Sequence, residues 1–150
     1  MERKRKIIPP VWLLLTLMAM VALHFALPVV RLIPAPYRDA GWLAVIAGVA
    51  VSAIAASAFR RAGTPVVPFE RSTALVTDGL FRYTRNPMYL GLVLVLLGVA
   101  VALGTLGAFL PIPVFVWIIR KWFIEGEERF LTEIFGEEYR AYQRRVRRWL

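Results

Sequence analysis

The chain has no cysteine and a single histidine, His24, among its 150 residues. Without cysteine a disulfide framework is impossible, and one histidine cannot assemble a Cys/His zinc site. Charged residues are also scarce, at 19% of the sequence, whereas hydrophobic residues make up 59%. This apolar share exceeds the roughly 45–50% of soluble domains, and disorder requires low hydrophobicity. The composition therefore argues against a soluble globule and against a disordered chain, and the length suits one domain.

Several signatures of soluble enzymes are missing as well. No G-x-G-x-x-G follows a predicted strand, which argues against a Rossmann-type cofactor domain. The chain also has no P-loop, no nucleophile elbow and no metalloprotease motif. In a soluble protein the formal net charge of +9 would suggest nucleic acid. Because the arginines here follow long apolar runs and no aromatic stacking platform accompanies them, we expect membrane lipids as a partner and no nucleic acid.

The sequence does contain three long apolar regions, residues 11–30, 41–59 and 88–119. A helix needs about 20 apolar residues to cross a bilayer core. As one helix the third region would be roughly 48 Å long, which exceeds the approximately 30 Å core. Glycines and prolines between residues 104 and 113 mark a turn within it. We therefore predict a helical hairpin, with limbs at residues 88–103 and 109–123.

The predicted fold class is all-α: a polytopic integral membrane protein with about four transmembrane helices, followed by C-terminal interfacial amphipathic helices. A cleaved signal peptide is the competing interpretation of the first apolar region, because the basic residues 3–6 resemble the start of one. The region is longer than a signal-peptide core, and no cleavage site followed by a polar mature domain is evident. We therefore favour a retained helix.

The distribution of Lys and Arg predicts the orientation in the membrane. Four of them lie in residues 3–6, five in residues 60–85 and eight in residues 120–148, whereas Arg31 and Arg38 lie at the opposite helix ends. Positive charge accumulates on the cytoplasmic side of membrane proteins. We therefore expect both termini to be cytoplasmic, at the cell inner membrane or an equivalent one.

Two stretches are predicted to lie outside the membrane. Residues 62–86, with Pro65 and Pro68, are typical of an ordered loop with one short helical turn. In residues 125–150, Gly136 separates two helices, and the second, residues 137–149, is basic and amphipathic and suits the membrane interface. We expect one structural domain, in which residues 1–61 form a two-helix membrane region and residues 62–150 carry the chemistry.

The densest cluster of candidate functional residues lies where the hairpin begins. Asn86 and Pro87 suit the N-cap and the first position of a helix, whose free N–H groups attract anions. Arg85 beside them can hold a carboxylate. The alternative is structural: a capped helix with an interfacial arginine and with Tyr89 in an aromatic belt.

A second cluster, Glu125, Glu127 and Glu128, lies where the last membrane helix leaves the apolar region. Acidic residues next to hydrocarbon require an explanation. They can pair with nearby cations, bind a cationic ligand, or form a solvated helix face. The possible internal partners are Arg82, Arg85, Arg120 and Lys121. Together the two clusters suit a zwitterionic, positively charged ligand.

His24 lies inside the first predicted membrane helix. A lone intramembrane histidine is by default a candidate functional residue. Since the sequence shows no partner for its ring, we expect instead a structural hydrogen bond between helices.

The residues of these clusters resemble the isoprenylcysteine carboxyl methyltransferase family and, more distantly, the membrane phospholipid N-methyltransferases. The family writes its central motif as Arg-His-Pro-x-Tyr-x-Gly. The resemblance covers half of the chain, from about Thr73 onward, and its motifs occur in the family's order with the hairpin between them. The matching residues are Leu75-Val76-Thr77-Asp78-Gly79, Arg85-Asn86-Pro87-Met88-Tyr89-Leu90-Gly91, Glu127-Glu128, Phe135-Gly136-Glu137-Glu138-Tyr139, Tyr142 and Val146.

The resemblance implies S-adenosyl-L-methionine as the cofactor, bound at the cytoplasmic side by residues 62–150. It also implies a lipid-like or lipidated small molecule as the methyl acceptor, and no metal. Carried over by position, the cofactor contacts come from Thr73, Ala74, Leu75, Val76, Phe81, Asn86, Pro87, Met88, Tyr89 and Glu127. The chemistry of the residues agrees, because Asn86 and the helix-start donors suit the methionine carboxylate and Glu127 suits its amino group.

The chain departs from the family pattern at three positions. Asn86 replaces the family histidine, which argues against an obligatory base there, and Phe81 stands where tyrosine is common. Eukaryotic members place a substrate-binding arginine at the position of Phe123, and Arg120 lies nearby. The candidate catalytic residues are Arg85, Arg120 and Glu128. Glu128 is the candidate base if the acceptor is an amine, whereas a carboxylate acceptor needs no base.

The resemblance therefore implies an integral-membrane S-adenosylmethionine-dependent methyltransferase similar to isoprenylcysteine carboxyl O-methyltransferases. The acceptor would enter sideways from the bilayer and the cofactor from the cytosol. Two alternatives stay open. One is a phospholipid ethanolamine N-methyltransferase, and the other is a non-catalytic membrane protein whose basic tail binds anionic lipid.

Overall fold

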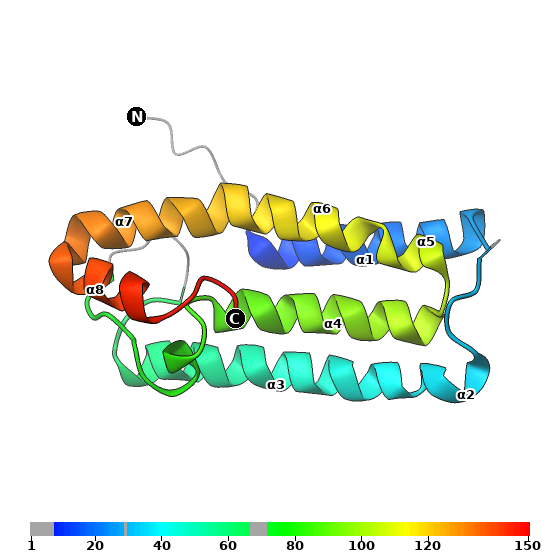
Figure 1. Cartoon of the computed structure of the whole chain (residues 1–150), viewed down its shortest axis with the longest axis horizontal. Coiled ribbons are helices and arrows are strands. Elements are labelled where there is room, and N and C mark those ends of the chain that lie inside the picture. The colour runs from blue at the N-terminus through cyan, green and yellow to red at the C-terminus, as the bar shows by residue number, and fades with distance from the viewer. Residues whose placement is uncertain (1–7, 29, 67–71) are drawn as a thin grey trace.

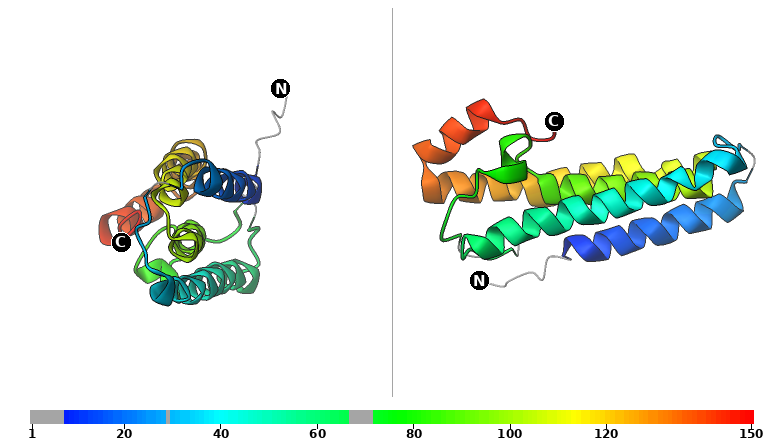
Figure 2. Two further views of the ribbon diagram at one scale, coloured as in Figure 1. Left: turned by 90° about the vertical axis from the view of Figure 1, so that its right-hand side faces the viewer. Right: turned by 90° about the horizontal axis from the view of Figure 1, so that it is seen from below.

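The computed structural model describes residues 8–28, 30–66 and 72–150, and the regular elements in these residues are helices. The predicted all-α class is therefore confirmed. Figure 1 shows α3 (Ala40–Arg61) and α4 (Pro87–Leu103) side by side, with the short helix α2 (Ala35–Arg38) leading into α3. Seen end on, α4 lies between α3 and the pair formed by α1 (Pro9–Ala26) and α6 (Pro111–Ile118) (Figure 2).

Three helical stretches are long and apolar enough to cross a bilayer: Pro9–Ala26, Ala35–Arg61 and Leu106–Phe135. The helix α4 is apolar as well but has only 17 residues. These stretches indicate an integral membrane protein, as the composition predicts. The basic residues 3–6, Pro68 and Arg71, which entered the sequence-based predictions, lie outside the described residues.

The hairpin turns where the glycines predict it. The helix α4 ends at Gly104, whose φ of 73° is a left-handed conformation that favours glycine. The second limb begins at Leu106 rather than at residue 109, because α5 (Leu106–Phe109) follows the turn directly. It continues through α6 and the π-helical turn η2 (Ile119–Ile124) into α7 (Glu125–Phe135). The predicted end at residue 123 is wrong, because no proline interrupts the chain there and η2 carries the helix on.

Four glycines bring α3 and α4 into close contact, since Gly41 faces Gly98 and Gly48 faces Gly91. A Cβ atom added to Gly48 would lie 2.5 Å from the carbonyl oxygen of Gly91 and 2.7 Å from the amide nitrogen of Val95. These separations are shorter than a side chain permits, so only glycine allows the two backbones to approach in this way. The paired glycines fix the position of α4 against α3, and with it the position of the residues at the start of α4.

Buried apolar side chains form two clusters in the described residues. The larger joins α1, α4, α5, α6 and η2, and its fully buried members include Met20, Leu96, Phe115 and Ile119. The smaller lies where α4 begins and joins α3 and α8 (Glu137–Arg145) to residues 72–86. Its buried members are Ala55, Val76, Phe81, Tyr139, Tyr142 and Val146. Phe81 comes from η1 (Gly79–Arg82), which is the short helical turn predicted in this loop.

The helix α8 ends at Arg145, so the predicted helix end at residue 149 is wrong. From Val146 the backbone is extended and returns to the start of α4, where the amide of Arg85 donates to the carbonyl oxygen of Arg147 at 3.0 Å. The end of the bundle around residues 85–89, 125–128 and 146–149 is named the polar end below. The opposite end, around residues 30–39 and 103–106, is named the turn end.

Candidate functional site

A cavity of about 350 Å³ lies at the polar end. Its walls come from the start of α1, from α3, from residues 72–76, from the start of α4, from α7 and from α8. Apolar side chains dominate the lining, with a few polar groups among them. This volume and this composition are typical of sites for small molecules, which occupy roughly 300–1,000 Å³. Segments that are far apart in the sequence thus enclose a space suited to a ligand.

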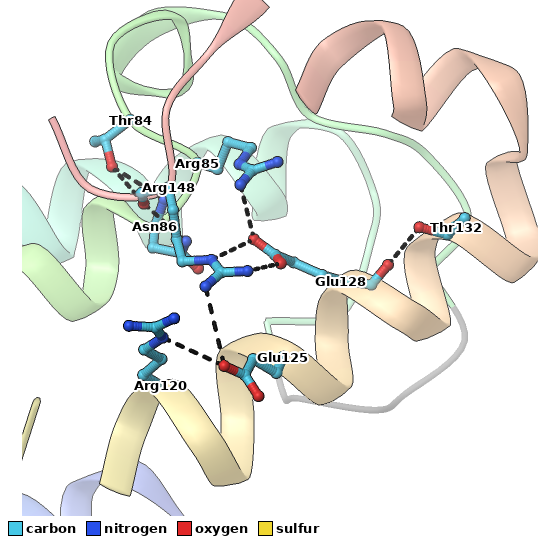
Figure 3. A network of polar contacts seen from close by, with 8 residues as sticks. All are labelled: Thr84, Arg85, Asn86, Arg120, Glu125, Glu128, Thr132 and Arg148. Atoms are coloured by element: carbon cyan, nitrogen blue, oxygen red, sulfur yellow. Dashed lines mark hydrogen bonds and ion pairs between the residues drawn. The ribbon is translucent and has the colours of Figure 1, made fainter. Parts of the chain in front are cut away.

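Most of the predicted site residues line this one cavity: Ala74, Leu75, Val76, Phe81, Arg85, Asn86, Pro87, Met88, Tyr89, Glu127 and Glu128. Thr73 and Arg120 are placed elsewhere. The amide of Thr73 donates to Thr64 Oγ1 and its hydroxyl to the carbonyl oxygen of Gly63, both at 3.1 Å. The half-exposed side chain of Arg120 pairs with Glu125 at 3.2 Å (Figure 3). The structure therefore brings the two predicted clusters together but leaves Arg120 outside the lining.

Glu127 presents a carboxylate to the cavity. Its Oε2 accepts a hydrogen bond from the hydroxyl of Tyr89, 3.1 Å away on α4, and Tyr89 is itself buried. Among the described residues, no Lys, Arg or His lies within ion-pairing distance of Glu127. A carboxylate in a largely apolar space without a cationic partner favours a positively charged ligand group. An ammonium group entering the cavity would meet this need.

Glu128, the next residue, is already neutralised by two arginines (Figure 3). Its Oε1 accepts from Arg85 Nη2 and from Arg148 Nε, each at 3.0 Å, and its Oε2 accepts from Arg148 Nη2 at 2.6 Å. These hydrogen bonds raise the pKa of Arg148 above its ordinary value. Both oxygens of Glu128 are thus engaged by arginines, in the charge-assisted geometry that arginine and carboxylate prefer.

The start of α4 differs from the prediction in one respect. The helix begins at Pro87 as expected, but the Asn86 side chain makes no capping bond to the helix. Instead its Nδ2 donates to the carbonyl oxygen of Arg148 at 2.9 Å, and Thr84 Oγ1 donates to the same oxygen at 3.3 Å. Asn86 is thus the N-cap residue, as predicted, but its side chain binds the returning C-terminal segment instead of the helix.

Arg85 retains an unused donor. Its Nε is buried and has no hydrogen-bond acceptor among the residues that the structure describes. A buried guanidinium N–H without an acceptor is costly, so its position in the cavity wall favours an anionic ligand group. The cavity thus offers a donor for a carboxylate at Arg85, an acceptor for an ammonium at Glu127, and apolar walls for a ring. These residues fit the methionine and adenosine parts of S-adenosylmethionine.

Sequence reasoning missed several residues of this site. One is Arg148, which the sequence presents only as a basic residue of the tail and which contacts both oxygens of Glu128. Tyr142 donates from its hydroxyl to the carbonyl oxygen of Phe81 at 2.6 Å and so holds η1 against the cavity. Burial raises the pKa of Tyr139 beside it to about 12. The aromatic spacing in α8 was visible in the sequence, whereas nothing local indicated that residues 146–149 turn back.

Comparison with known proteins adds a family assignment. The sequence profile of the phospholipid methyltransferase family matches residues 37–138. The chain is 44% identical to an uncharacterized protein of Haemophilus influenzae over 63 residues, which are 42% of this chain and 100% of that protein.

Two further relatives have names that state an activity. The chain is 35% identical over 72 residues, 48% of its length, to the protein-S-isoprenylcysteine O-methyltransferase of Schizosaccharomyces pombe. It is 30% identical over 108 residues, 71% of its length, to a probable protein-S-isoprenylcysteine O-methyltransferase of Oryza sativa subsp. indica. The matches span 30% of the first of these proteins and 56% of the second.

Proposed function

Because the chain belongs to the phospholipid methyltransferase family, whose members use S-adenosylmethionine, we propose that it transfers the methyl group of this cofactor to a lipophilic acceptor in a membrane. The acceptor is proposed to resemble that of isoprenylcysteine carboxyl O-methyltransferases. One observation supports the proposal above the others. Arg85 from the start of α4 and Glu127 from α7 line the same cavity, each with unmet capacity for an opposite charge.

The cofactor is proposed to lie with its carboxylate at Arg85 and its amino group at Glu127. Residues 74–76, Phe81 and Met88 supply apolar walls for the adenosine part. The bound cofactor supplies an electrophilic methyl group that its sulfonium already activates. The task of the protein is then to align the acceptor and to exclude water, which the largely apolar cavity suits.

The contacts of Glu128 favour an acceptor that needs no base. Both oxygens of Glu128 already accept hydrogen bonds from Arg85 and Arg148, so neither is free to contact an amine acceptor. An amine acceptor must lose a proton before it can react, whereas a carboxylate is already ionised near neutral pH. We therefore propose O-methylation of a carboxylate, with Glu128 as the structural partner of Arg85, the residue proposed to hold the cofactor. Arg120 has no part in this proposal.

The membrane arrangement is part of the same proposal. The helix α4, although shorter than the other three stretches, is proposed to cross the bilayer as one limb of the hairpin, which makes four spans. The polar end, with Arg60, Arg61, Arg82 and the arginines of α8, is proposed to face the cytoplasm, and both termini with it. Residues 62–150 then form the cofactor-binding region, with α8 at the interface.

Calorimetry with S-adenosylhomocysteine on the folded protein in detergent tests the proposal. We expect the wild type to bind and Glu127→Ala to bind at least about tenfold more weakly, because a charged contact is lost. Glu133→Ala, at an exposed position of the same helix, is the matched control and should bind as the wild type does. Folded wild-type protein that binds no S-adenosylhomocysteine would refute the proposal.

The acceptor is identified by incubation with methyl-labelled cofactor and a total lipid extract, followed by identification of the labelled species. A phospholipid ethanolamine N-methyltransferase is the second candidate, because the family profile that matches carries the name phospholipid methyltransferase. A pH–rate profile separates the two. Methylation of an amine loses rate as the pH falls below about 10, whereas a carboxylate acceptor stays ionised down to about pH 4. Labelling of no lipid at all would instead favour a non-catalytic protein that binds anionic lipid.

A further inference from the structure

We propose that Arg148 is a positioning residue that holds Glu128 and thereby keeps a donor of Arg85 free for the carboxylate of the cofactor. The inference rests on the proposed function, since it concerns how this cavity recognises its ligand. It assigns a role to a residue that neither the motifs nor the family resemblance singled out. Its starting point is the unequal way in which two arginines share one carboxylate.

The two arginines bind Glu128 differently (Figure 3). Arg148 forms the two-pronged contact, with Nε on Oε1 at 3.0 Å and Nη2 on Oε2 at 2.6 Å. Arg85 forms one contact, from Nη2 to Oε1 at 3.0 Å. Two parallel N–H···O bonds are the preferred geometry of an arginine–carboxylate pair. Arg148 therefore occupies the geometry that Arg85 would otherwise adopt.

The consequence appears at Arg85. Its side chain is only 11% exposed, it lines the cavity, and its Nε has no acceptor among the described residues. If Arg148 were absent, Oε2 of Glu128 would lose its partner and could turn to Arg85, and the pair would close into the two-pronged form. Arg85 would then have less to offer a ligand carboxylate. Arg148 thus acts on the ligand through Glu128 and Arg85, without touching it.

The segment that carries Arg148 is fixed by more than its side chain. Its carbonyl oxygen accepts from Asn86 Nδ2 at 2.9 Å, and the preceding carbonyl, that of Arg147, accepts from the amide of Arg85 at 3.0 Å. Val146 is buried in the smaller apolar cluster, and Trp149 packs against the larger one.

The other acidic neighbour of Arg148 is Glu125, which lies 4.0 Å away and is already paired with Arg120 and Lys121. Truncation of the Arg148 side chain should therefore leave the backbone in place.

The test compares two ligands by calorimetry. S-adenosylhomocysteine has the amino-acid part with its carboxylate, whereas 5′-methylthioadenosine has the adenosine and the sulfur without it. For Arg148→Ala we expect S-adenosylhomocysteine to bind about tenfold more weakly and methylthioadenosine to bind as it does to the wild type. Arg147→Ala is the matched control, because the exposed Arg147 contributes its backbone carbonyl, and both ligands should bind it normally.

A double variant sharpens the test. Glu128→Gln added to Arg148→Ala removes the charge that would capture Arg85, so we expect it to regain S-adenosylhomocysteine affinity relative to Arg148→Ala alone. Equal weakening of both ligands by Arg148→Ala would overturn the inference, because it would indicate a general structural role. Unchanged binding of both ligands would overturn it while leaving the proposed function intact. Wild-type protein that binds neither ligand would end both proposals.

Discussion

The two ends of the helical bundle are held together by different kinds of contact. At the turn end the bonds are mostly between backbone groups: the amide of Leu106 donates to the carbonyl of Val30 at 2.9 Å, and that of Leu32 to the carbonyl of Gly104 at 2.8 Å. Side-chain bonds add to them: His24 Nδ1 and Thr105 Oγ1 lie 2.9 Å apart, which is the kind of hydrogen bond predicted for this histidine, and Arg38 Nε donates to the carbonyl oxygen of Ile33 at 3.1 Å. At the polar end charged side chains provide the corresponding contacts, through Glu128 and its two arginines.

The difference shows which end can receive a ligand. Within the described residues, the buried side-chain nitrogens without an acceptor are Arg85 Nε, at the polar end, and Trp12 Nε1, in the first turns of α1. The turn end has none in this part of the chain. A region whose polar groups are already paired gains little from binding a charged molecule, whereas one with an unpaired donor and a lone carboxylate gains a partner for each. Four predictions test this contrast.

The largest effect is expected from crowding the α3–α4 contact. Gly91→Leu and Gly98→Leu each force a side chain against the backbone of α3, and overpacking of this kind costs roughly 3 kcal/mol of stability. Only Gly91→Leu should also weaken S-adenosylhomocysteine binding, because its Cβ collides with Ser52, a residue of the cavity wall. Thermal unfolding in detergent and calorimetry measure the two effects. Equal loss of ligand affinity in both variants would contradict the view that ligand binding depends on the polar end alone.

A smaller loss is expected for Tyr142→Phe at the polar end. The variant leaves the buried carbonyl of Phe81 without its donor, which costs roughly 1–3 kcal/mol, and η1 should loosen at the cavity. We expect a lower unfolding temperature together with weaker binding of S-adenosylhomocysteine. Tyr83→Phe is the control, since Tyr83 is 73% exposed. Unaltered affinity in a clearly destabilised Tyr142→Phe protein would separate η1 from ligand binding.

At the turn end, Thr105→Val should cost about 1 kcal/mol, because it removes the hydrogen-bond partner of His24. Here we expect a change in unfolding temperature alone, with S-adenosylhomocysteine affinity equal to that of the wild type. His24→Ala, which removes the other partner, should behave in the same way. A shift in affinity in either variant would show that the two ends are coupled through the bundle.

The smallest effect belongs to Glu137, an exposed residue of α8 that pairs with Arg144 at 2.7 Å. The hydrogen bond from Arg144 lowers the pKa of Glu137. A carboxyl whose pKa is lowered by folding adds stability above its ordinary pKa and loses that contribution as the pH falls through the folded value. The wild type should therefore exceed Glu137→Gln in unfolding temperature slightly at neutral pH and not in acid. A difference that grew in acid would contradict this sign.

Much of the fold followed from local features of the sequence. The apolar runs predicted α1, α3 and α4 because their length and composition are local properties, and Gly104 predicted the turn because it adopts a positive φ. The helix ends that were predicted wrongly have different causes: near residue 123 the π-helical turn continues the helix, whereas residue 149 lies in an extended segment that bonds to the start of α4. The pairing of Gly48 with Gly91 was equally hidden, because it requires knowing which helices are neighbours.

The residues of the candidate site likewise separate into those that local sequence features predicted and those that depend on long-range contacts. Charge and motif brought attention to Arg85, Asn86 and Glu127, which line one cavity. The sequence offered four cations as partners for the glutamates. The structure pairs Arg120 and Lys121 with Glu125 and pairs Arg85 with Glu128. Glu128 has a further partner, Arg148, which was not among the four. That choice depends on the extended segment after α8 returning to α4. This return cannot be predicted from the periodicity of apolar residues, because an extended segment of a few residues has no repeating pattern.

The π-helical turn η2 has a consequence for how this protein tolerates insertions and deletions. A π-helical turn, with i→i+5 bonds, holds one residue more than an α-helical turn. Loss of one residue within residues 119–124 would therefore let this turn close as an α-helix and leave Glu127 and Glu128 facing Tyr89 and Arg85. Loss of one residue from α6, which is α-helical, would instead rotate everything beyond it by about 100° relative to the preceding apolar limb. A single-residue deletion in this long helix should therefore be tolerated best at η2.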